Sequence, residues 1–154
     1  MKLIAHRGNI SGINSDRENS PEYIEESITF GFESEVDVWY NEETKELMLG
    51  HDEPKYKVSF SWLRDKKNKL WIHCKNIQAL YYFSSITEKF NFFWHQQDDF
   101  TLTNRGYIWT YPGKCITPMS IMVMPEWKIN NLNLYDFKLF NCYGVCSDFV
   151  SNIN

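Results

Sequence analysis

The sequence predicts a single α/β domain in which short, mostly parallel strands alternate with helices. The chain has 154 residues, a length that suits one domain. Hydrophobic residues make up 43% and charged residues 23%, which is typical of a packed core rather than of disorder. Apolar runs recur with helical patterns between them, and strands separated by helices pair in parallel. We therefore expect residues 1–154 to form one domain.

The first strand and helix are predicted from short local signals. The apolar run 3–5 predicts a strand that ends at His6-Arg7-Gly8. A polar loop follows, and then Ser20-Pro21-Glu22 has the composition of a helix start, with a capping serine and a proline in the first turn. Gly31 supplies a stop signal for this helix.

A second strand is predicted over residues 35–40, where valines alternate with carboxylates. The tight turn 41–45 leads to a third strand over 46–50, and a turn this short ordinarily joins an antiparallel hairpin. Strand directions at this point therefore remain open. Residues 60–63 fit either a short helix or a covering loop.

The remaining elements follow the same alternation. Further strands are expected at 70–72, 91–94, 107–110, 121–124 and 143–146, and helices at 77–90 and 132–140. The segments 98–106 and 112–118 are rich in Gly, Pro, Asn and Thr and are expected to be loops.

Composition excludes several function classes. The chain has 16 basic and 20 acidic residues, a formal net charge of −4, which argues against a nucleic-acid partner. It has no run of 18 apolar residues, so we expect no membrane span, and no secretory signal is visible. Its four cysteines match no paired zinc pattern. We expect reduced thiols and a cytoplasmic location.

The histidines mark the candidate site. His6, His51, His73 and His95 all fall at the predicted carboxyl ends of strands. In a barrel or an open parallel sheet those ends converge on the ligand-binding face. A single histidine there is more often a packed or surface residue, but all four sharing this placement favours a site.

Glu35 and Asp37 are a second set of candidate site residues. Residues two apart on a strand share a face, so both carboxylates project to the same side. Two neighbouring carboxylates repel unless a proton or a cation lies between them, and a divalent cation with oxygen ligands satisfies both. The alternative is a solvated strand face opposite Val36 and Val38.

An ordered set of motifs resembles the glycerophosphodiester phosphodiesterase family. The set is His6-Arg7-Gly8, Glu18-Asn19-Ser20, Glu35-Val36-Asp37-Val38, and a strand ending at His51-Asp52. It spans residues 3 to 52, about a third of the chain, and the run from Gly144 to Asp148 is similar to the closing strand of the family. The resemblance implies a (β/α)8 TIM-type barrel. Because the chain is short, we expect a compact version with several outer helices missing or shortened, and a homodimer could cover the bare side.

The resemblance also implies roles for individual residues. It makes His6 and His51 the catalytic acid and base, assigns phosphate binding to Arg7 and Lys75, and assigns a divalent metal to Glu35 and Asp37. The supporting polar residues would be Glu18, Asn19 and Asp52.

The sequence departs from the family at the third metal ligand. Where the family has Glu-x-Lys, this chain has His73-Cys74-Lys75, so His73 would replace a carboxylate. Mg²⁺ or Ca²⁺ is the expected ion from the family, but an imidazole ligand weakens the site for them and suits Mn²⁺ or Zn²⁺ better.

Aromatic residues near strand ends suggest a cleft for the rest of the substrate. Trp39, Trp94, Trp109, Tyr111 and Gln96 are candidates that could stack a sugar or enclose a choline, and the alternative for each aromatic is ordinary core packing.

We therefore predict a metal-dependent phosphodiesterase that acts on a small phosphodiester such as a glycerophosphodiester. One alternative is a catalytically inactive barrel that binds a phosphorylated ligand, which the His73 substitution favours. Another is a lipid phosphodiesterase similar to sphingomyelinase D, which the net negative charge and the missing secretory signal disfavour.

Overall fold

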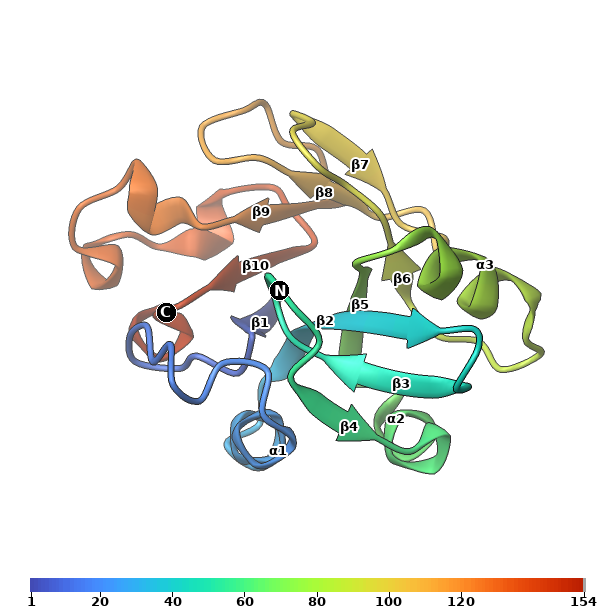
Figure 1. Ribbon diagram of the computed structural model, residues 1–154. Coiled ribbons are helices and arrows are strands. Elements are labelled where there is room, and N and C mark those ends of the chain that lie inside the picture. Colours follow the sequence, from blue (N-terminus) through green and yellow to red (C-terminus); the bar gives the residue numbers. More distant parts are fainter. Residues whose placement is uncertain (154) are drawn as a thin grey trace.

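The computed structural model describes residues 1–153 and shows a curled, mostly β-sheet molecule (Figure 1). Within this range the strands are β1 (Lys2–His6), β2 (Glu33–Asn41), β3 (Glu46–Leu49), β4 (Tyr56–Val58), β5 (Leu70–Cys74), β6 (Phe92–Phe93), β7 (Phe100–Leu102), β8 (Ile108–Thr110), β9 (Ser120–Val123) and β10 (Gly144–Ser147). The α-helices are α1 (Pro21–Thr29), α2 (Phe60–Lys66) and α3 (Ile77–Ser85). The 3-10 turns are η1 (Pro125–Trp127), η2 (Leu132–Leu134), η3 (Phe137–Leu139) and η4 (Val150–Asn152).

A parallel ladder forms the centre of the sheet. The order β6-β5-β2-β1-β10-β9-β8 is parallel throughout, and β1 lies between β2 and β10. β3 and β4 extend the far half of β2 as an antiparallel meander, and β7 pairs antiparallel with β8. Over residues 1–153 no strand pairing joins β6 to β8, so the curl stays open.

The prediction of a (β/α)8 TIM-type barrel is wrong. In the described chain the molecule is a strand-rich half-barrel with only three short α-helices, all of which precede β6. The strands after β6 are joined by loops and 3-10 turns, because connecting segments such as 112–118 are too short and too rich in helix-breaking residues to add helices. The segment 98–106, predicted as a loop, contains the short strand β7. Antiparallel additions at β3, β4 and β7 also break the alternation that a TIM barrel requires.

Two of the predicted helices differ from the structure. The helix predicted over 77–90 ends at Ser85, and the segment 132–140 forms the two short turns η2 and η3 instead of a helix. The helix predicted from Ser20 is present as α1, where the Ser20 hydroxyl accepts a hydrogen bond from Tyr23 N at 3.3 Å. The short strands β4 and β7 were not predicted.

The two faces of the sheet lie in different environments, because successive side chains along each strand point to opposite faces. The outer face packs against the helices through a cluster that includes Ile24, Val36, Ile72 and Phe83. The inner face of the curl carries Ile4, Trp71, Phe93, Trp109, Ile121 and Cys146, each from a different strand. This inner cluster fills the curl below the carboxyl ends of the strands and supports the polar residues above it.

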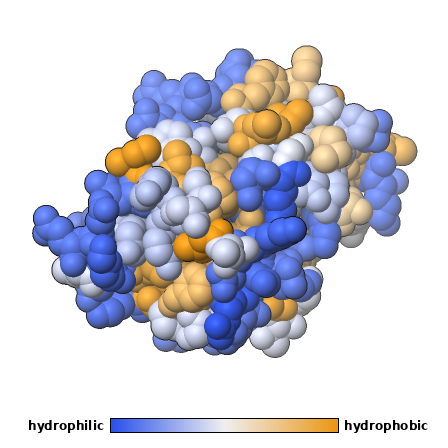
Figure 2. All heavy atoms as spheres, turned by 90° about the vertical axis from the view of Figure 1, so that its right-hand side faces the viewer, coloured by the Kyte–Doolittle hydropathy of each residue, from blue (hydrophilic) through white to orange (hydrophobic). Residues whose placement is uncertain are grey.

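The surface that carries α3 mixes hydrophilic residues with separate hydrophobic patches (Figure 2). Ile77 and Tyr81 of α3 are among the exposed apolar side chains. Among residues 1–153 no helix is both long enough and apolar enough to cross a membrane. The cysteines Cys74, Cys115, Cys142 and Cys146 are all free.

Candidate functional site

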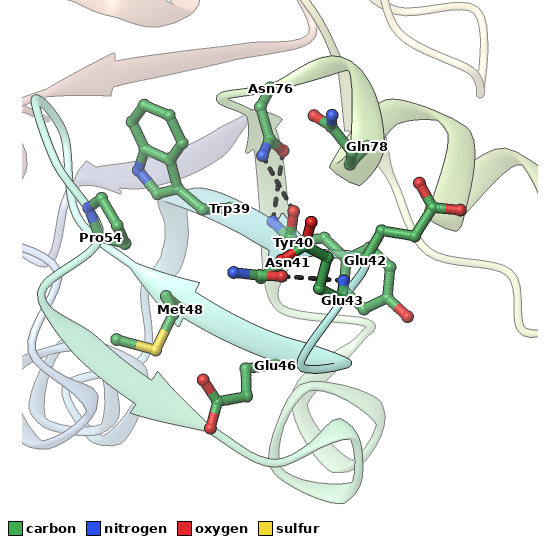
Figure 3. A pocket seen from close by; sticks show the side chains of 10 residues that line it. All are labelled: Trp39, Tyr40, Asn41, Glu42, Glu43, Glu46, Met48, Pro54, Asn76 and Gln78. Atoms are coloured by element: carbon green, nitrogen blue, oxygen red, sulfur yellow. Dashed lines mark hydrogen bonds between the residues drawn. The ribbon is translucent and has the colours of Figure 1, made fainter.

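A hollow of about 590 Å³ lies beside β2 and β3 and includes Trp39. Its carboxylates Glu42, Glu43 and Glu46 point in different directions (Figure 3), and Glu46 forms an ion pair with Lys57. Trp39 donates its indole N–H to Gly50 O at 2.6 Å, so this side chain stabilises the turn after β3. These groups do not converge on a common point, and none of the residues predicted to act in catalysis lines this hollow.

A second cavity, of about 450 Å³, contains most of the predicted site. It opens at the carboxyl ends of the parallel strands, where the inner-face residues of successive strands meet. The predicted site residues on its wall are His6, Arg7, Glu18, Glu35, Asp37, His51 and His73. Lys75 lines a smaller adjoining pocket of about 210 Å³ that shares His51, His73 and His95 with the larger cavity.

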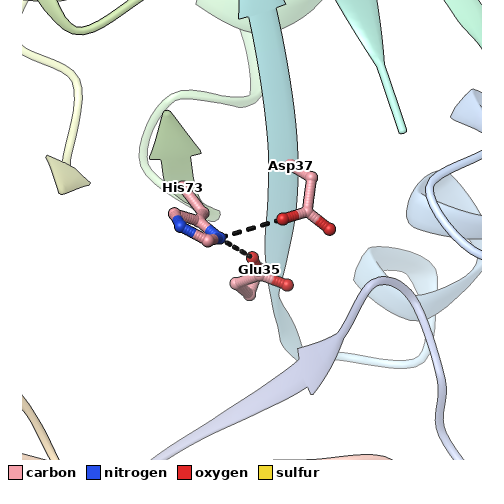
Figure 4. Close-up of side chains that lie close together, drawn as sticks. All are labelled: Glu35, Asp37 and His73. Carbon is pink, nitrogen blue, oxygen red and sulfur yellow. Dashed lines mark hydrogen bonds and ion pairs between the residues drawn. The ribbon is translucent and has the colours of Figure 1, made fainter. Parts of the chain in front are cut away.

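Glu35, Asp37 and His73 form a buried cluster on the wall of this cavity (Figure 4). One donor atom from each lies within 4.8 Å of the others. His73 Nδ1 is 2.9 Å from Asp37 Oδ1 and 3.9 Å from Glu35 Oε1. Neighbouring strands β2 and β5 produce this geometry, because their register pairs Asp37 with His73. This is the only group of its kind over residues 1–153.

The orientation of His73 suits a metal ligand. Its Nε2 lies 3.3 Å from the backbone carbonyl of His95, which can only accept a hydrogen bond, so Nε2 carries a proton. Nδ1 is therefore the ring nitrogen that faces the carboxylates; it pairs with Asp37 in this structure and would contact a cation bound at the cluster instead. The ring is held between Phe93 and His95, with ring centroids 5.2 and 4.4 Å away.

The electrostatic surroundings of the two carboxylates differ. Burial alone would raise the pKa of Asp37, but the hydrogen bond with His73 and the positive charges of Arg7 and Lys75 hold that pKa well below its usual range. Arg7 Nε is 3.1 Å and Lys75 Nζ is 3.5 Å from the Asp37 carboxylate. Burial, and then the charge of Asp37, raise the pKa of Glu35.

Arg7 and Asn19 reach Asp37 through unusual backbone conformations. Their φ angles are +52° and +62°, in the left-handed region that non-glycine residues rarely occupy. Asn19 donates from Nδ2 to Asp37 Oδ2 at 2.9 Å and accepts from Asp37 N at 2.9 Å. Strained backbone concentrated around one buried carboxylate is a feature of functional sites.

His6 is oriented by Asp148, which the sequence suggested only as the residue following the last strand. His6 Nδ1 lies 2.8 Å from Asp148 Oδ1. Asn9 holds the same oxygen at 2.7 Å and also donates to Glu18. Burial alone would lower the pKa of His6, but the hydrogen bond to Asp148 and the charge of Glu35 outweigh it and raise that pKa. The His6 Nε2 atom is the ring nitrogen left for a ligand.

His51 occupies a more open position on the turn after β3. Its Nδ1 lies 2.6 Å from Asp52 Oδ1, and its side chain is 41% exposed. Burial, and then the charge of Arg7, lower the pKa of His51. The imidazoles of His6 and His51 therefore have pKa values displaced in opposite directions, which is typical of an acid and base pair.

Gly50 sets the path of the turn that carries His51. Its φ is +150°, and a Cβ there would lie 2.1 Å from Glu53 O. We expect Gly50→Ala to lower the free energy of unfolding by ~1–3 kcal/mol, measured by urea denaturation, because backbone must move to relieve the clash. Gly106→Ala is the matched control, since Gly106 also has positive φ (+82°) but nothing within 4 Å of its Cβ position. Equal losses in the two variants would contradict the clash.

The charges around the cavity leave a negative excess. Five carboxylates line the cavity, those of Glu18, Glu35, Asp37, Asp98 and Asp148, and the permanent cations in the cavity and its adjoining pocket are Arg7 and Lys75. This excess of carboxylates over cations favours the binding of a divalent cation.

The residues predicted to form an aromatic cleft line different pockets. Trp109, Tyr111 and Gln96 line the large cavity, and Trp94 lines the small pocket with Lys75. The sequence reasoning missed Trp127, Asp98 and Asp148, which also line the large cavity. The only available signal was for Asp148, from its position after the last strand.

Comparisons of the chain with protein-family models, with curated proteins and with solved structures gave no match.

Proposed function

We propose that the protein is a metal-dependent phosphodiesterase that hydrolyses small phosphodiesters, such as glycerophosphodiesters, by histidine acid–base catalysis. One observation carries this proposal. A histidine oriented by a buried carboxylate, His6 with Asp148, shares a cavity with the Glu35–Asp37–His73 cluster and with Arg7. Resemblance of the motifs between residues 3 and 52 to glycerophosphodiester phosphodiesterases supports the same chemistry.

Different residues of the cavity would take different roles in the hydrolysis of a phosphodiester. Arg7 and Lys75 neutralise the phosphoryl oxygens. One of the imidazoles, His6 or His51, removes a proton from the attacking hydroxyl, and the other delivers a proton to the departing alkoxide. The raised pKa of His6 favours it as the acid, and the lowered pKa of His51 favours that residue as the base. The attacking group is water or a hydroxyl of the substrate.

The donor set fits a divalent metal. Two ligands bound at ~2.1 Å from one ion lie at most ~4.2 Å apart, and the 2.9 and 3.9 Å separations from His73 Nδ1 fall within that limit. Glu35, Asp37 and His73 would hold the ion, which would polarise a phosphoryl oxygen when bound. Two carboxylates and an imidazole favour Mn²⁺ or Zn²⁺ over the Mg²⁺ or Ca²⁺ of an all-carboxylate site.

Release of product from bis-p-nitrophenyl phosphate and from glycerophosphodiesters, with and without a chelator, tests the function. We expect a chelator to abolish turnover and added Mn²⁺ to restore it. Tight binding of a phosphorylated ligand without turnover would instead favour the alternative of a binding protein, in which the replacement of a family carboxylate by His73 abolishes catalysis.

Metal binding should be measurable without substrate. At ~100-fold excess over Kd, Mn²⁺ should stabilise the fold by ~2.7 kcal/mol and raise Tm by roughly 5–10 °C. Glu35→Gln should remove most of this rise because it deletes a charged ligand, and Glu42→Gln, in the other hollow, should keep it. His73→Glu should shift the preference toward Mg²⁺ and Ca²⁺. Equal rises in wild type and Glu35→Gln would contradict the assigned ligands.

A further inference from the structure

Part of the cavity lining is aromatic. Trp109 of β8, Tyr111 just after β8 and Trp127 of η1 line it, and we call these three residues the aromatic subsite. Trp109 is 6% exposed, but Tyr111 and Trp127 are 48% and 58% exposed. Large aromatic faces left open at the mouth of a cavity are surfaces on which a flat or apolar group can be desolvated.

The rings of Tyr111 and Trp127 form a corner. Their centroids are 6.2 Å apart and their planes meet at 75°. A planar ligand can therefore lie flat against one ring and present its edge to the other, which is the geometry that aromatic pairs prefer. A long alkyl chain gains no such benefit from the right-angled arrangement.

Polar groups on the adjoining wall narrow the choice of ligand. Gln96 and Asp98 line the same cavity. Asp98 accepts a hydrogen bond from the backbone N–H of Gln96 at 3.1 Å, and the exposed side-chain amide of Gln96 is not hydrogen-bonded to another residue within the part of the chain that the structure describes. An amide that offers both a donor and an acceptor matches the edge of a nucleobase, as glutamine does with adenine. A quaternary ammonium group would use the aromatic faces but would form no hydrogen bond with this amide.

We propose that the aromatic subsite binds the base of a nucleoside, so that the preferred substrates are small nucleoside phosphodiesters. This inference rests on the proposed phosphodiesterase function, because it places the phosphate at the Arg7 and Glu35 end of the cavity. The base stacks on Trp127, and Gln96 reads its polar edge. A cavity of about 450 Å³ lies in the range used for ligands of this size.

Binding of the nucleoside alone tests the subsite independently of catalysis. Calorimetric titration of the metal-loaded protein should show adenosine binding at least about tenfold more tightly than ribose or choline. Trp127→Ala should weaken adenosine about tenfold, and Trp127→Phe should restore most of the affinity because it keeps a stacking face. Tyr81→Ala, which removes an exposed aromatic ring from α3 outside the cavity, is the matched control and should bind as wild type. Equal affinities for adenosine, ribose and choline would overturn the proposal.

Turnover gives the second readout. The methyl ester of adenosine 5′-phosphate should be hydrolysed with a kcat/KM at least about tenfold above that of the methyl ester of glycerol 3-phosphate, and Trp127→Ala should reduce this ratio toward one. Hydrolysis of both esters with no preference would overturn the nucleoside proposal and leave the phosphodiesterase intact. Trp127-dependent adenosine binding with no hydrolysis of either ester would instead overturn the proposed function and retain the subsite.

Discussion

Replacement of His6 by alanine will lower kcat on phosphodiesters by at least ~10², because it removes a proton-transfer group from the reacting centre. The change leaves Asp148 with its hydrogen bond from Asn9 at 2.7 Å, so that buried carboxylate keeps a partner. A stopped or continuous assay with bis-p-nitrophenyl phosphate at saturating substrate measures the loss, and an unchanged Tm shows that the fold is retained.

The Asp148→Asn variant separates the role of Asp148 in orienting His6 from the role of His6 in proton transfer. Asparagine keeps the size of the side chain but loses the charge that raises the pKa of His6. We expect a smaller fall in kcat than for His6→Ala, together with a shift of the pH profile to lower pH, since the imidazolium form of His6 is less stabilised. A His6→Ala variant that keeps more than a tenth of wild-type turnover would refute the assignment of His6.

The sequence predicts the placement of those site residues whose side-chain direction is set by their own strand. Glu35 and Asp37 share a face because strand side chains alternate, and His6 stands at the end of a recognisable apolar run. The partnership of His6 with Asp148 could not be predicted in this way. It depends on β10 pairing with β1 over a separation of 142 residues, and a periodic pattern carries no information on such non-local pairing.

The fold was harder to predict because the same alternation suits a closed barrel and an open, curled sheet. The segment 132–140 shows why a local pattern misleads. Its apolar spacing resembles a helix, but Leu132 and Phe137 are buried by two separate 3-10 turns. The first turn ends at Tyr135, whose backbone is extended, and Asp136 caps the second turn by accepting a hydrogen bond from Lys138 N at 3.0 Å, a role that competes with a continuous helix.

Phe93→Ala will cost ~3–5 kcal/mol of the free energy of unfolding, the usual range for deleting a buried phenylalanine ring. Phe93 lies on β6, at one end of the open sheet, and is 2% exposed. Its ring stacks on Trp109 of β8 with centroids 4.5 Å apart. Because no strand pairing joins β6 to β8 over residues 1–153, this side-chain stack is a main connection across the opening of the curl.

The same ring also supports His73, whose centroid is 5.2 Å away, so Phe93→Ala should weaken Mn²⁺ binding as well as stability. Urea unfolding measures the first effect, and the Mn²⁺-dependent rise in Tm measures the second. Phe100→Ala is the matched control, because Phe100 of β7 is 49% exposed and should lose no more than ~1 kcal/mol. If the two variants lose equal stability, side-chain stacking does not hold the curl together. The hydrogen bonds of Asn104 with Phe90 and Phe92, among them Asn104 N to Phe92 O at 3.0 Å and Phe92 N to Asn104 Oδ1 at 2.8 Å, would then connect the two sides.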